Sequence, residues 1–189
     1  MVLKLLKSRY PAQTIFHDLY LKMNESQFSQ IDLILATKVG LIVFEVKKYS
    51  GWIYGTGYQP KWTQVLAFGK EKYRFYNPVV QNKKHIQNLK KLLSPYQIPI
   101  FSVVVFYGDC VFKDLSFIPS GTFVVKSERI LDVLKKIETE NIPAPYTQQN
   151  KSKIVRVLKL AVQNGESREI QAKHKANIKE MLGMERILR

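Results

Sequence analysis

The stretch QIDLILATKVGLIVFEVKKYSG, residues 30–51, predicts a β-hairpin around which the rest of the fold is arranged. Two apolar runs flank TKVG, and their Val, Ile and Phe residues suit a pleated, half-buried surface. A two-residue turn at Lys38 and Val39 would set Asp32 opposite Glu45. Because side chains alternate between the two faces of a strand, one face is then entirely apolar. It carries Ile31, Leu33, Leu35, Ile42, Phe44 and Val46.

The other face of the predicted hairpin gathers polar side chains at the end away from the turn: Gln30, Asp32, Glu45 and Lys47. Directly opposed residues hold their Cβ atoms about 4.5–5.5 Å apart, so two carboxylates placed there repel each other. Lys47 brings one positive charge against two negative charges. A divalent cation would supply the rest, and carboxylate oxygens suit Mg²⁺ or Mn²⁺. The alternative is a half-solvated strand face with an ordinary Glu–Lys ion pair, and the spacing alone does not separate the two.

The charge of the chain indicates its partners. Its 189 residues include 30 Lys and Arg against 15 Asp and Glu, which leaves a net charge of +15. Nucleic acid is the commonest polyanionic partner of such a chain, and a solvated basic surface is the alternative. The length suggests one domain with a small appendage.

The sequence also predicts the compartment. A single cysteine, Cys110, allows no internal disulfide. The start, MVLKLLKSRY, places lysines inside its apolar run, which a secretory signal avoids. No stretch approaches the roughly 18 apolar residues of a membrane span. We therefore expect a soluble, cytoplasmic protein that has no membrane partner.

The order of predicted elements indicates an α/β fold. Asn77 and Pro78 are a good N-cap and first residue for a helix that runs up to Pro95. The run IFSVVVFY, residues 100–107, is apolar on both faces, which is typical of a central strand reached by a parallel crossover. The other expected elements are a short helix at 1–8, strands at 13–23, 30–36 and 41–47, a hairpin insertion at 51–65, strands at 72–77 and 122–125, a helix at 127–140, a linker at 141–150, and basic helices near 152–163 and 167–182.

These motifs together resemble a known family. QID, then FEVKKYSG, then a Trp-containing insertion, then NPVVQNKKHIQNLKKLL is similar to the nuclease-related domain, NERD, over roughly Thr14 to Phe106. That family belongs to the PD-(D/E)XK, restriction-endonuclease-like superfamily. The resemblance implies an α-β-β-β-α-β core with a mixed sheet, which matches the predicted order. We expect a nuclease-like domain at 1–126 and a C-terminal helical extension at 127–189, packing on or beside the core.

The resemblance also implies roles for the polar residues. Asp32 and Glu45 look like the metal-binding acids, with the carbonyl of Val46 completing the site. Lys47 looks like the residue that orients the attacking water or stabilises developing charge on the phosphate. Gln81 is the expected contributor from the following helix. Two further residues match the motif of that helix and have simpler explanations, since Asn77 would serve as a cap and His85 as a hydrogen-bonding residue at the edge of the core.

Nucleic acid, DNA in preference to RNA, is the expected partner. Trp52 and Trp62 would stack on bases or, alternatively, cover a sheet edge. The basic C-terminal stretch 151–189 is expected to contact phosphates. The residues predicted to contact nucleic acid are Gln30, Lys48, Trp62, Lys83, Lys84, Lys151, Lys153 and Arg156.

One departure from the family affects the expected activity. The family's first helix is longer and carries a Gly-Glu pair whose Glu often reaches the metal, whereas this chain has no acidic residue before Asp18. Glu25 lies in a predicted turn, which does not favour it as a substitute. The expected function is metal-dependent hydrolysis of DNA phosphodiesters, using Mg²⁺ or Mn²⁺, and superfamily enzymes often act as homodimers. The alternative is a weak or inactive nuclease-fold module that binds nucleic acid or a protein partner.

Overall fold

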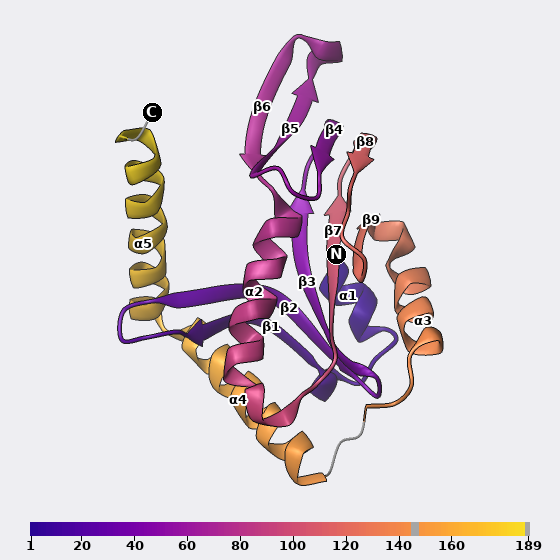
Figure 1. Ribbon diagram of the computed structural model, residues 1–189, viewed down its shortest axis with the longest axis vertical. Helices are drawn as coiled ribbons and strands as arrows, with labels where there is room; N and C mark the ends of the chain where they lie inside the picture. Colours follow the sequence, from indigo (N-terminus) through magenta and orange to yellow (C-terminus); the bar gives the residue numbers. More distant parts are fainter. Residues whose placement is uncertain (145–147, 188–189) are drawn as a thin grey trace.

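The computed structural model describes residues 1–144 and 148–187, which form an α/β fold with two mixed sheets (Figure 1). One sheet has five strands in the order β1-β2-β3-β7-β9, and the other has four in the order β6-β5-β4-β8. The strands are β1 (Ile15–Lys22), β2 (Phe28–Thr37), β3 (Gly40–Lys48), β4 (Gly51–Thr56), β5 (Lys61–Leu66), β6 (Glu71–Tyr76), β7 (Ile100–Tyr107), β8 (Cys110–Ser116) and β9 (Thr122–Lys126). The helices are α1 (Val2–Lys7), α2 (Pro78–Leu92), α3 (Ile130–Glu140), α4 (Gln148–Glu166) and α5 (Arg168–Ile187).

The predicted hairpin is confirmed as β2 and β3. Thr37 pairs with Gly40 across the two-residue turn, and the antiparallel register continues as far as Leu33 with Phe44. There the pairing ends, and β1 and β2 run across the direction of β3 and β7 (Figure 1). The ends of β2 and β3 that carry Asp32 and Glu45 therefore lie where two strands diverge.

One face of the hairpin differs from the prediction. Leu33, Leu35, Ile42 and Phe44 share a core cluster under α1 and α3, as the alternation predicts. Ile31 instead belongs to the cluster under α2 and α4, together with Leu19, its partner on β1. The prediction assumed an unbroken alternation, whereas the strands change course at Asp18 and Asp32, which no regular pair joins.

The crossover is confirmed, because β7 lies parallel to β3 and is reached through α2. The Asn77 side chain accepts hydrogen bonds from the backbone N–H groups of Val79 (2.9 Å) and Val80 (3.4 Å), which caps α2 as its sequence predicts. A further parallel strand, β9, extends the sheet beyond β7.

The two sheets are continuous through β3 and β7. The backbone N–H of Tyr49 donates to the Tyr107 carbonyl (3.1 Å), and that of Gly51 donates to the Asp109 carbonyl (3.0 Å). Beyond this joint β4 pairs in parallel with β8, a strand that the sequence prediction missed. Its residues, CVFKDLS, lack a clear alternation, and a register shift interrupts its pairing at Ile53 and Tyr54.

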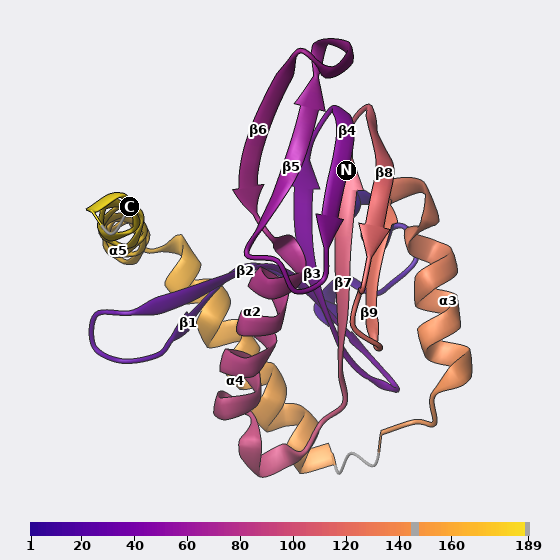
Figure 2. The same cartoon turned by 45° about the horizontal axis from the view of Figure 1, so that its top comes forward.

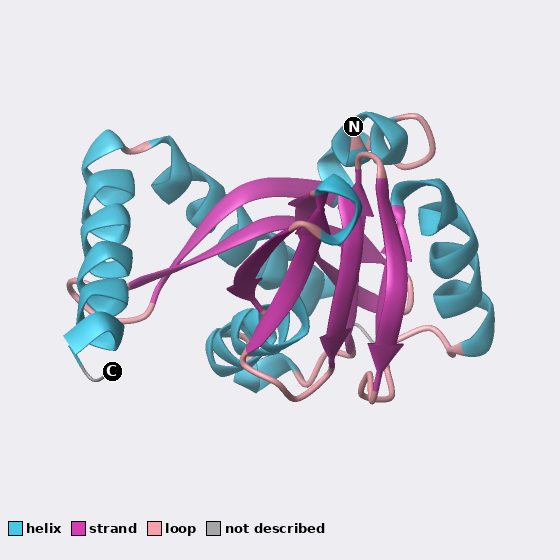
Figure 3. Cartoon of the chain, turned by 90° about the horizontal axis from the view of Figure 1, so that it is seen from above, coloured by secondary structure: helices cyan, strands magenta, loops and turns pink. Residues whose placement is uncertain are grey.

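Helices cover both faces of the larger sheet (Figure 3). The α1 and α3 helices pack on one face, and α3 contributes Ile130, Leu134 and Ile137 to the core there. The α2 and α4 helices pack on the other, where α4 contributes Ile154, Leu158 and Ala161. The predicted helix at 127–140 begins with a 3-10 turn. The linker predicted at 141–150 is shorter than expected, because α4 begins at Gln148. Residues 145–147 of that linker lie outside the described residues. The division of the chain at residue 126 stays a prediction.

None of the helices described at 1–144 and 148–187 combines the length and the apolar character that crossing a membrane requires.

Candidate active site

The Asp32 side chain lies at the point where β2 leaves β3. Its Oδ2 accepts a hydrogen bond from the backbone N–H of Val46 at 2.8 Å. The last regular pair between these strands is Leu33 with Phe44, so a side chain takes the place of the next strand-to-strand contact. This bond fixes the carboxylate of Asp32 against the strand that carries Glu45 and Lys47.

Glu45 is the most deeply buried acid of the site, with 1 % of its surface exposed. Its Oε1 lies 2.5 Å from the Lys47 ammonium. Its Oε2 lies 3.4 Å from Nε2 of His85 and makes no hydrogen bond with any described residue. A buried carboxylate oxygen without a hydrogen bond is costly, so this atom is open to a further positive partner.

Helix α2 supports the charged residues from one face. The Gln81 Oε1 accepts a hydrogen bond from the Lys47 ammonium at 3.1 Å. One turn later His85 places Nε2 near Glu45, and its Nδ1 is 3.0 Å from the hydroxyl of Ser29 on β2. Residues four apart lie on the same side of a helix, which explains why both reach the hairpin. His85 thus has the hydrogen bond at the core edge that the sequence analysis considered, and it also faces Glu45.

Asn82 anchors this helix and was not among the residues predicted from the sequence. Its buried side-chain amide donates to the Val43 carbonyl (3.0 Å) and to the Ser102 hydroxyl (2.9 Å), which ties α2 to β3 and β7. The signal was present, because Asn82 occupies a helical position between the apolar residues Val79 and Ile86. A polar residue on the buried side of a helix usually marks a specific hydrogen bond.

The electrostatics of the pair show unbalanced negative charge. The pKa of Asp32 is raised from 3.8 to about 6, first by burial and then by the charge of Glu45. The Val46 N–H, Lys47 and His85 act in the opposite direction without cancelling the rise. A carboxyl group in such a position favours either a proton or an additional cation.

The chemistry of these groups fits a hard divalent cation. Asp32 and Glu45 supply carboxylate oxygens, one of them buried without a hydrogen bond, and the carbonyl of Val46 belongs to the same strand as Glu45. Within residues 1–144 and 148–187, no group of three or more His, Cys, Asp or Glu side chains is arranged to hold a metal. The protein would therefore supply few ligands, and Mg²⁺ accepts such sites because it keeps several waters.

A pocket of about 190 Å³ opens beside Asp32, on the side of α1. The first residues of the chain bring only apolar side chains to it, so α1 supplies no acid there. Asp18 lines the same pocket and has a positive φ of 54°. Its neighbours His17 and Leu19 pair with Leu33 and Ile31, so Asp18 lies across from Asp32. Its carboxylate is 2.9 Å from Nδ1 of His17.

Asp18 is the acid nearest in register to Asp32, and it was not among the site residues predicted from the sequence. The predicted turn at 24–26 determines the register of β1 on β2, and that register places Asp18 across from Asp32. Glu25 is paired with Lys22 at 3.0 Å in the β1–β2 turn, where both side chains are largely exposed.

The structure corrects the predicted role of Trp62. Its ring is 1 % exposed, stacks on Phe106 with the centroids 6.0 Å apart, and donates from Nε1 to the Thr56 carbonyl at 2.8 Å. A ring enclosed in this way cannot stack on a base, so Trp62 is a core residue of the second sheet. Trp52 is half-buried, and the Lys113 ammonium lies 4.9 Å from its ring centroid.

The other residues predicted to contact nucleic acid lie in several places. Gln30 is half-buried on β2, beyond the last pair with β3. Lys48 is exposed at the end of β3, and the α2 and α4 helices carry the remaining residues, all exposed: Lys83, Lys84, Lys151, Lys153 and Arg156. Their contact with nucleic acid stays a prediction.

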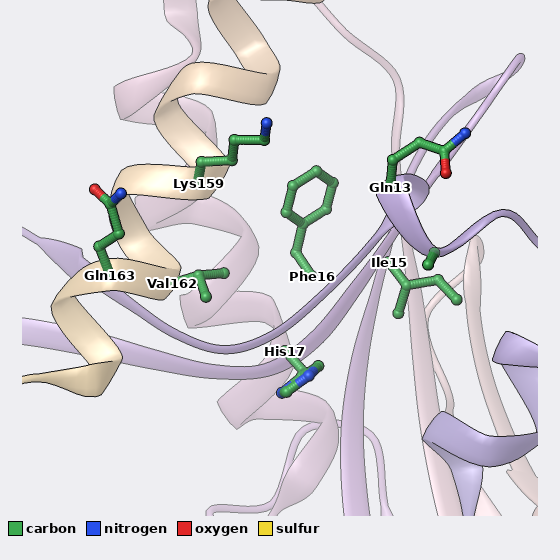
Figure 4. A pocket seen from close by; sticks show the side chains of 8 residues that line it. Gln13, Ile15, Phe16, His17, Lys159, Val162 and Gln163 are labelled. Carbon is green, nitrogen blue, oxygen red and sulfur yellow. The ribbon is translucent and has the colours of Figure 1, made fainter.

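A second pocket, of about 290 Å³, lies between the start of β1 and α4 (Figure 4). Phe16 and His17 face it from β1, and Lys159, Val162 and Gln163 face it from α4. It is not lined by Asp32, Glu45 or Lys47, and it contains no acidic residue. We therefore place the candidate site at the divergence of β2 and β3.

Comparisons with known proteins give a family match and a similar protein. The family model of the nuclease-related domain, NERD, matches residues 1–107, a range that includes Asp32, Glu45, Lys47 and Gln81. A Bacillus anthracis protein described as uncharacterized is 34% identical over 99 residues, which cover 52% of this chain and 45% of that protein. The chain thus spans less than half the length of this relative, and no solved structure matches it. Because the family model covers more than half of its residues, the chain belongs to the nuclease-related domain family.

Proposed function

We propose that this chain is a divalent-metal-dependent nuclease that hydrolyses phosphodiester bonds of DNA, with a PD-(D/E)XK type of site. The observation that carries the proposal is the buried Glu45, which has one oxygen without a hydrogen bond and lies beside Asp32, whose pKa is raised to about 6. Lys47 supplies one positive charge to these two acids, and a divalent cation would balance the remaining negative charge. The membership in a nuclease-related family supports the reaction class.

Asp32, Glu45 and the Val46 carbonyl are the groups that would hold the metal. When bound, Mg²⁺ or Mn²⁺ would supply a more acidic water and a positive charge for the phosphate oxygens. The chain's own part is to hold the two carboxylates rigidly. The Val46 N–H fixes Asp32, and the hairpin that carries both acids is packed on both faces by core clusters.

Lys47 would add the second positive charge of the site. Its ammonium is held between Glu45 and the amide oxygen of Gln81, so it is oriented before any substrate arrives. A preorganised charge stabilises negative charge that develops in the transition state and costs little reorganisation. Gln81 would act through Lys47 as a positioning residue.

A second candidate function rests on the ligand count. No third acid from α1 reaches the site, and Asp18 is largely exposed and already paired with His17. Weak metal affinity would follow, and a module that binds nucleic acid without cutting it is the corresponding alternative. The nuclease is favoured by the contacts that hold together the four residues with expected catalytic roles, Asp32, Glu45, Lys47 and Gln81.

Plasmid nicking distinguishes the two. The parent chain should convert supercoiled DNA to the open circle slowly, and faster with Mn²⁺ than with Mg²⁺, because Mn²⁺ tolerates imperfect geometry better. Glu45→Gln, prepared in the same way, should abolish nicking, which also excludes a contaminating nuclease, whereas Lys135→Gln, an exposed change on α3, should leave nicking unchanged. If the parent binds DNA and never nicks it with either metal, the non-cutting alternative holds.

A further inference from the structure

The hairpin of β5 and β6 projects away from the rest of the protein (Figures 1 and 2). Strand β6 is an outer strand of the second sheet, and it leads through Asn77 directly into α2, which carries Gln81. Its six residues extend about 20 Å at the rise of an extended strand. The hairpin, which we call the arm and define as residues 61–76, is therefore attached at the helix that supports the candidate site.

The outward face of the arm is basic. Phe75 faces inward, with its ring stacked 4.3 Å from that of Tyr49. Because side chains alternate along a strand, Lys72, Arg74 and Tyr76 lie on the opposite face. The two cations are exposed, and neither they nor Lys70 forms an ion pair with any residue in the described part of the chain.

By the same alternation, Tyr76 shares the basic face of the arm, whereas Glu71 and Tyr73 lie on the face of Phe75. Glu71 is the one acid within residues 61–76, and its carboxylate already accepts a hydrogen bond from the Tyr73 hydroxyl at 3.0 Å. Tyr73 and Tyr76 are 52% and 44% exposed. On the basic face, two exposed cations are thus followed by the exposed ring of Tyr76, and cations beside an exposed ring suit a phosphate backbone and its bases.

The tip of the arm exposes a phenyl ring. Phe68 is 95% exposed, and three consecutive residues there, Ala67, Phe68 and Gly69, have positive φ angles of 49°, 54° and 102°. A left-handed conformation disfavours residues other than glycine, so the turn holds Phe68 outward against the local backbone preference. Apolar side chains presented in this way serve as wedges between base steps in proteins that bind DNA.

The simplest alternative is that the charges protect an edge strand. Lysines on an outer strand discourage pairing with another chain. Edge protection accounts for Lys72 and Arg74. It does not account for Phe68, because an exposed phenyl ring at the tip adds apolar surface that favours association with another chain.

We propose that the arm is a DNA-binding element that holds the duplex on one side of the cleavage position. Lys72 and Arg74 contact phosphates, and Phe68 makes an apolar contact with the bases. The proposal deepens the proposed function and rests on it for the identity of the ligand. At about 20 Å of reach, the arm would contact DNA more than half a helical turn from its base.

The test measures binding of a duplex of about three helical turns by fluorescence anisotropy over a range of salt, in EDTA to prevent cleavage. Each phosphate contact contributes about −0.9 to the slope of log affinity against log salt. Lys72→Gln with Arg74→Gln should therefore reduce the slope by about 1.8. The control, Lys135→Gln with Lys136→Gln on α3, removes the same charge from exposed positions and should leave the slope nearly unchanged.

Phe68→Ser gives a separate reading. It should weaken binding by about tenfold and leave the slope unchanged, since it removes an apolar contact and no charge. All three altered side chains are exposed, so far-ultraviolet circular dichroism should show a folded protein for each variant.

The DNA-binding role of the arm and the nuclease activity of the site can be contradicted by different results. If the parent nicks plasmid and the arm variants keep the parent's salt slope, the proposed DNA-binding role of the arm is wrong. If the parent binds duplex through the arm but does not nick plasmid, the proposed nuclease activity is wrong and the DNA-binding role of the arm is supported. If the arm variants lose binding to phosphatidylserine vesicles and keep the parent's affinity for DNA, the arm is a membrane contact and the proposal is wrong; a parent that does not bind duplex at all also overturns it.

Discussion

At the scale of the residue, Asp32 carries the clearest electrostatic signal. Burial and Glu45 raise its pKa from 3.8 to about 6, so in the absence of metal its ionised form is disfavoured in the folded chain. The free energy of unfolding depends on this difference through the protons bound by each state. A rise of this size corresponds to at most about 3 kcal/mol.

The sign of this effect gives the first prediction. Between about pH 4 and pH 6 the folded chain holds a proton on Asp32 that the unfolded chain has lost, so this residue makes stability fall as the pH rises through that window. Asp32→Asn keeps an oxygen for the Val46 N–H and removes the charge. In EDTA at pH 7 the variant should be more stable than the parent by up to about 3 kcal/mol, and the difference should vanish near pH 4. Urea unfolding at several pH values measures it, and a variant less stable than the parent at pH 7 would show that the acid pair is not unbalanced.

Lys47 gives the second prediction. Lys47→Ala removes a positive charge and no metal ligand, so Mn²⁺ binding should persist or tighten while cleavage falls by about 10²–10³-fold, the usual cost of losing one preorganised stabilising group. Calorimetry and plasmid nicking on the same preparation separate the two effects. Loss of metal binding in this variant would instead make Lys47 a structural partner of Glu45.

At the scale of the element, α2 is the support of the site. Asn82→Ala removes two buried hydrogen bonds and leaves acceptors on β3 and β7 without their donor, which should cost about 1–3 kcal/mol of stability. Gln87→Ala, exposed on the same helix, should cost little. Thermal unfolding of both variants measures the difference, and equal effects would mean that Asn82 does not anchor the helix.

The elements also show what the sequence can predict. The β2–β3 register from Thr37–Gly40 to Leu33–Phe44 followed from a two-residue turn and alternation, which are local properties, but the expected pair of Asp32 with Glu45 lies beyond the last regular pair. The place of Ile31 did not follow, because the change of course at Asp18 and Asp32 depends on how β1 and β2 pack on α4. The burial of Trp62 did not follow either, because a short aromatic hairpin carries no signal for which of its faces is covered.

At the scale of the whole molecule, the two C-terminal helices differ in what they contribute. Helix α4 buries Ile154, Leu158 and Ala161 against the sheet, whereas α5 reaches the body through polar contacts, such as His174 Nδ1 with the Phe28 carbonyl (3.1 Å) and the Asn177 side chain with the Ser26 carbonyl (2.8 Å). Burial of an Ile or Leu side chain contributes about 1.5–3 kcal/mol each.

A chain that ends before Arg168 should therefore remain folded. One that ends before Lys151 should lose most of its stability, because the α4 side of the core would be exposed. Urea midpoints of the two truncated chains test this difference. Equal midpoints would show that α4 is a peripheral helix, and any DNA-binding role of α4 is best examined with Lys153→Gln and Arg156→Gln, which preserve the core.

The proposed site requires that Asp32 and Glu45 together hold a divalent cation, which calorimetric titration of Mn²⁺ can measure. The parent should bind one Mn²⁺ weakly, and binding near pH 6 should release protons, since Asp32 must give up its proton to become a ligand. Asp32→Asn should bind far more weakly and release fewer protons. Equal Mn²⁺ affinity of the parent and Asp32→Asn, with the same proton release, would place the metal elsewhere and rule out the proposed site.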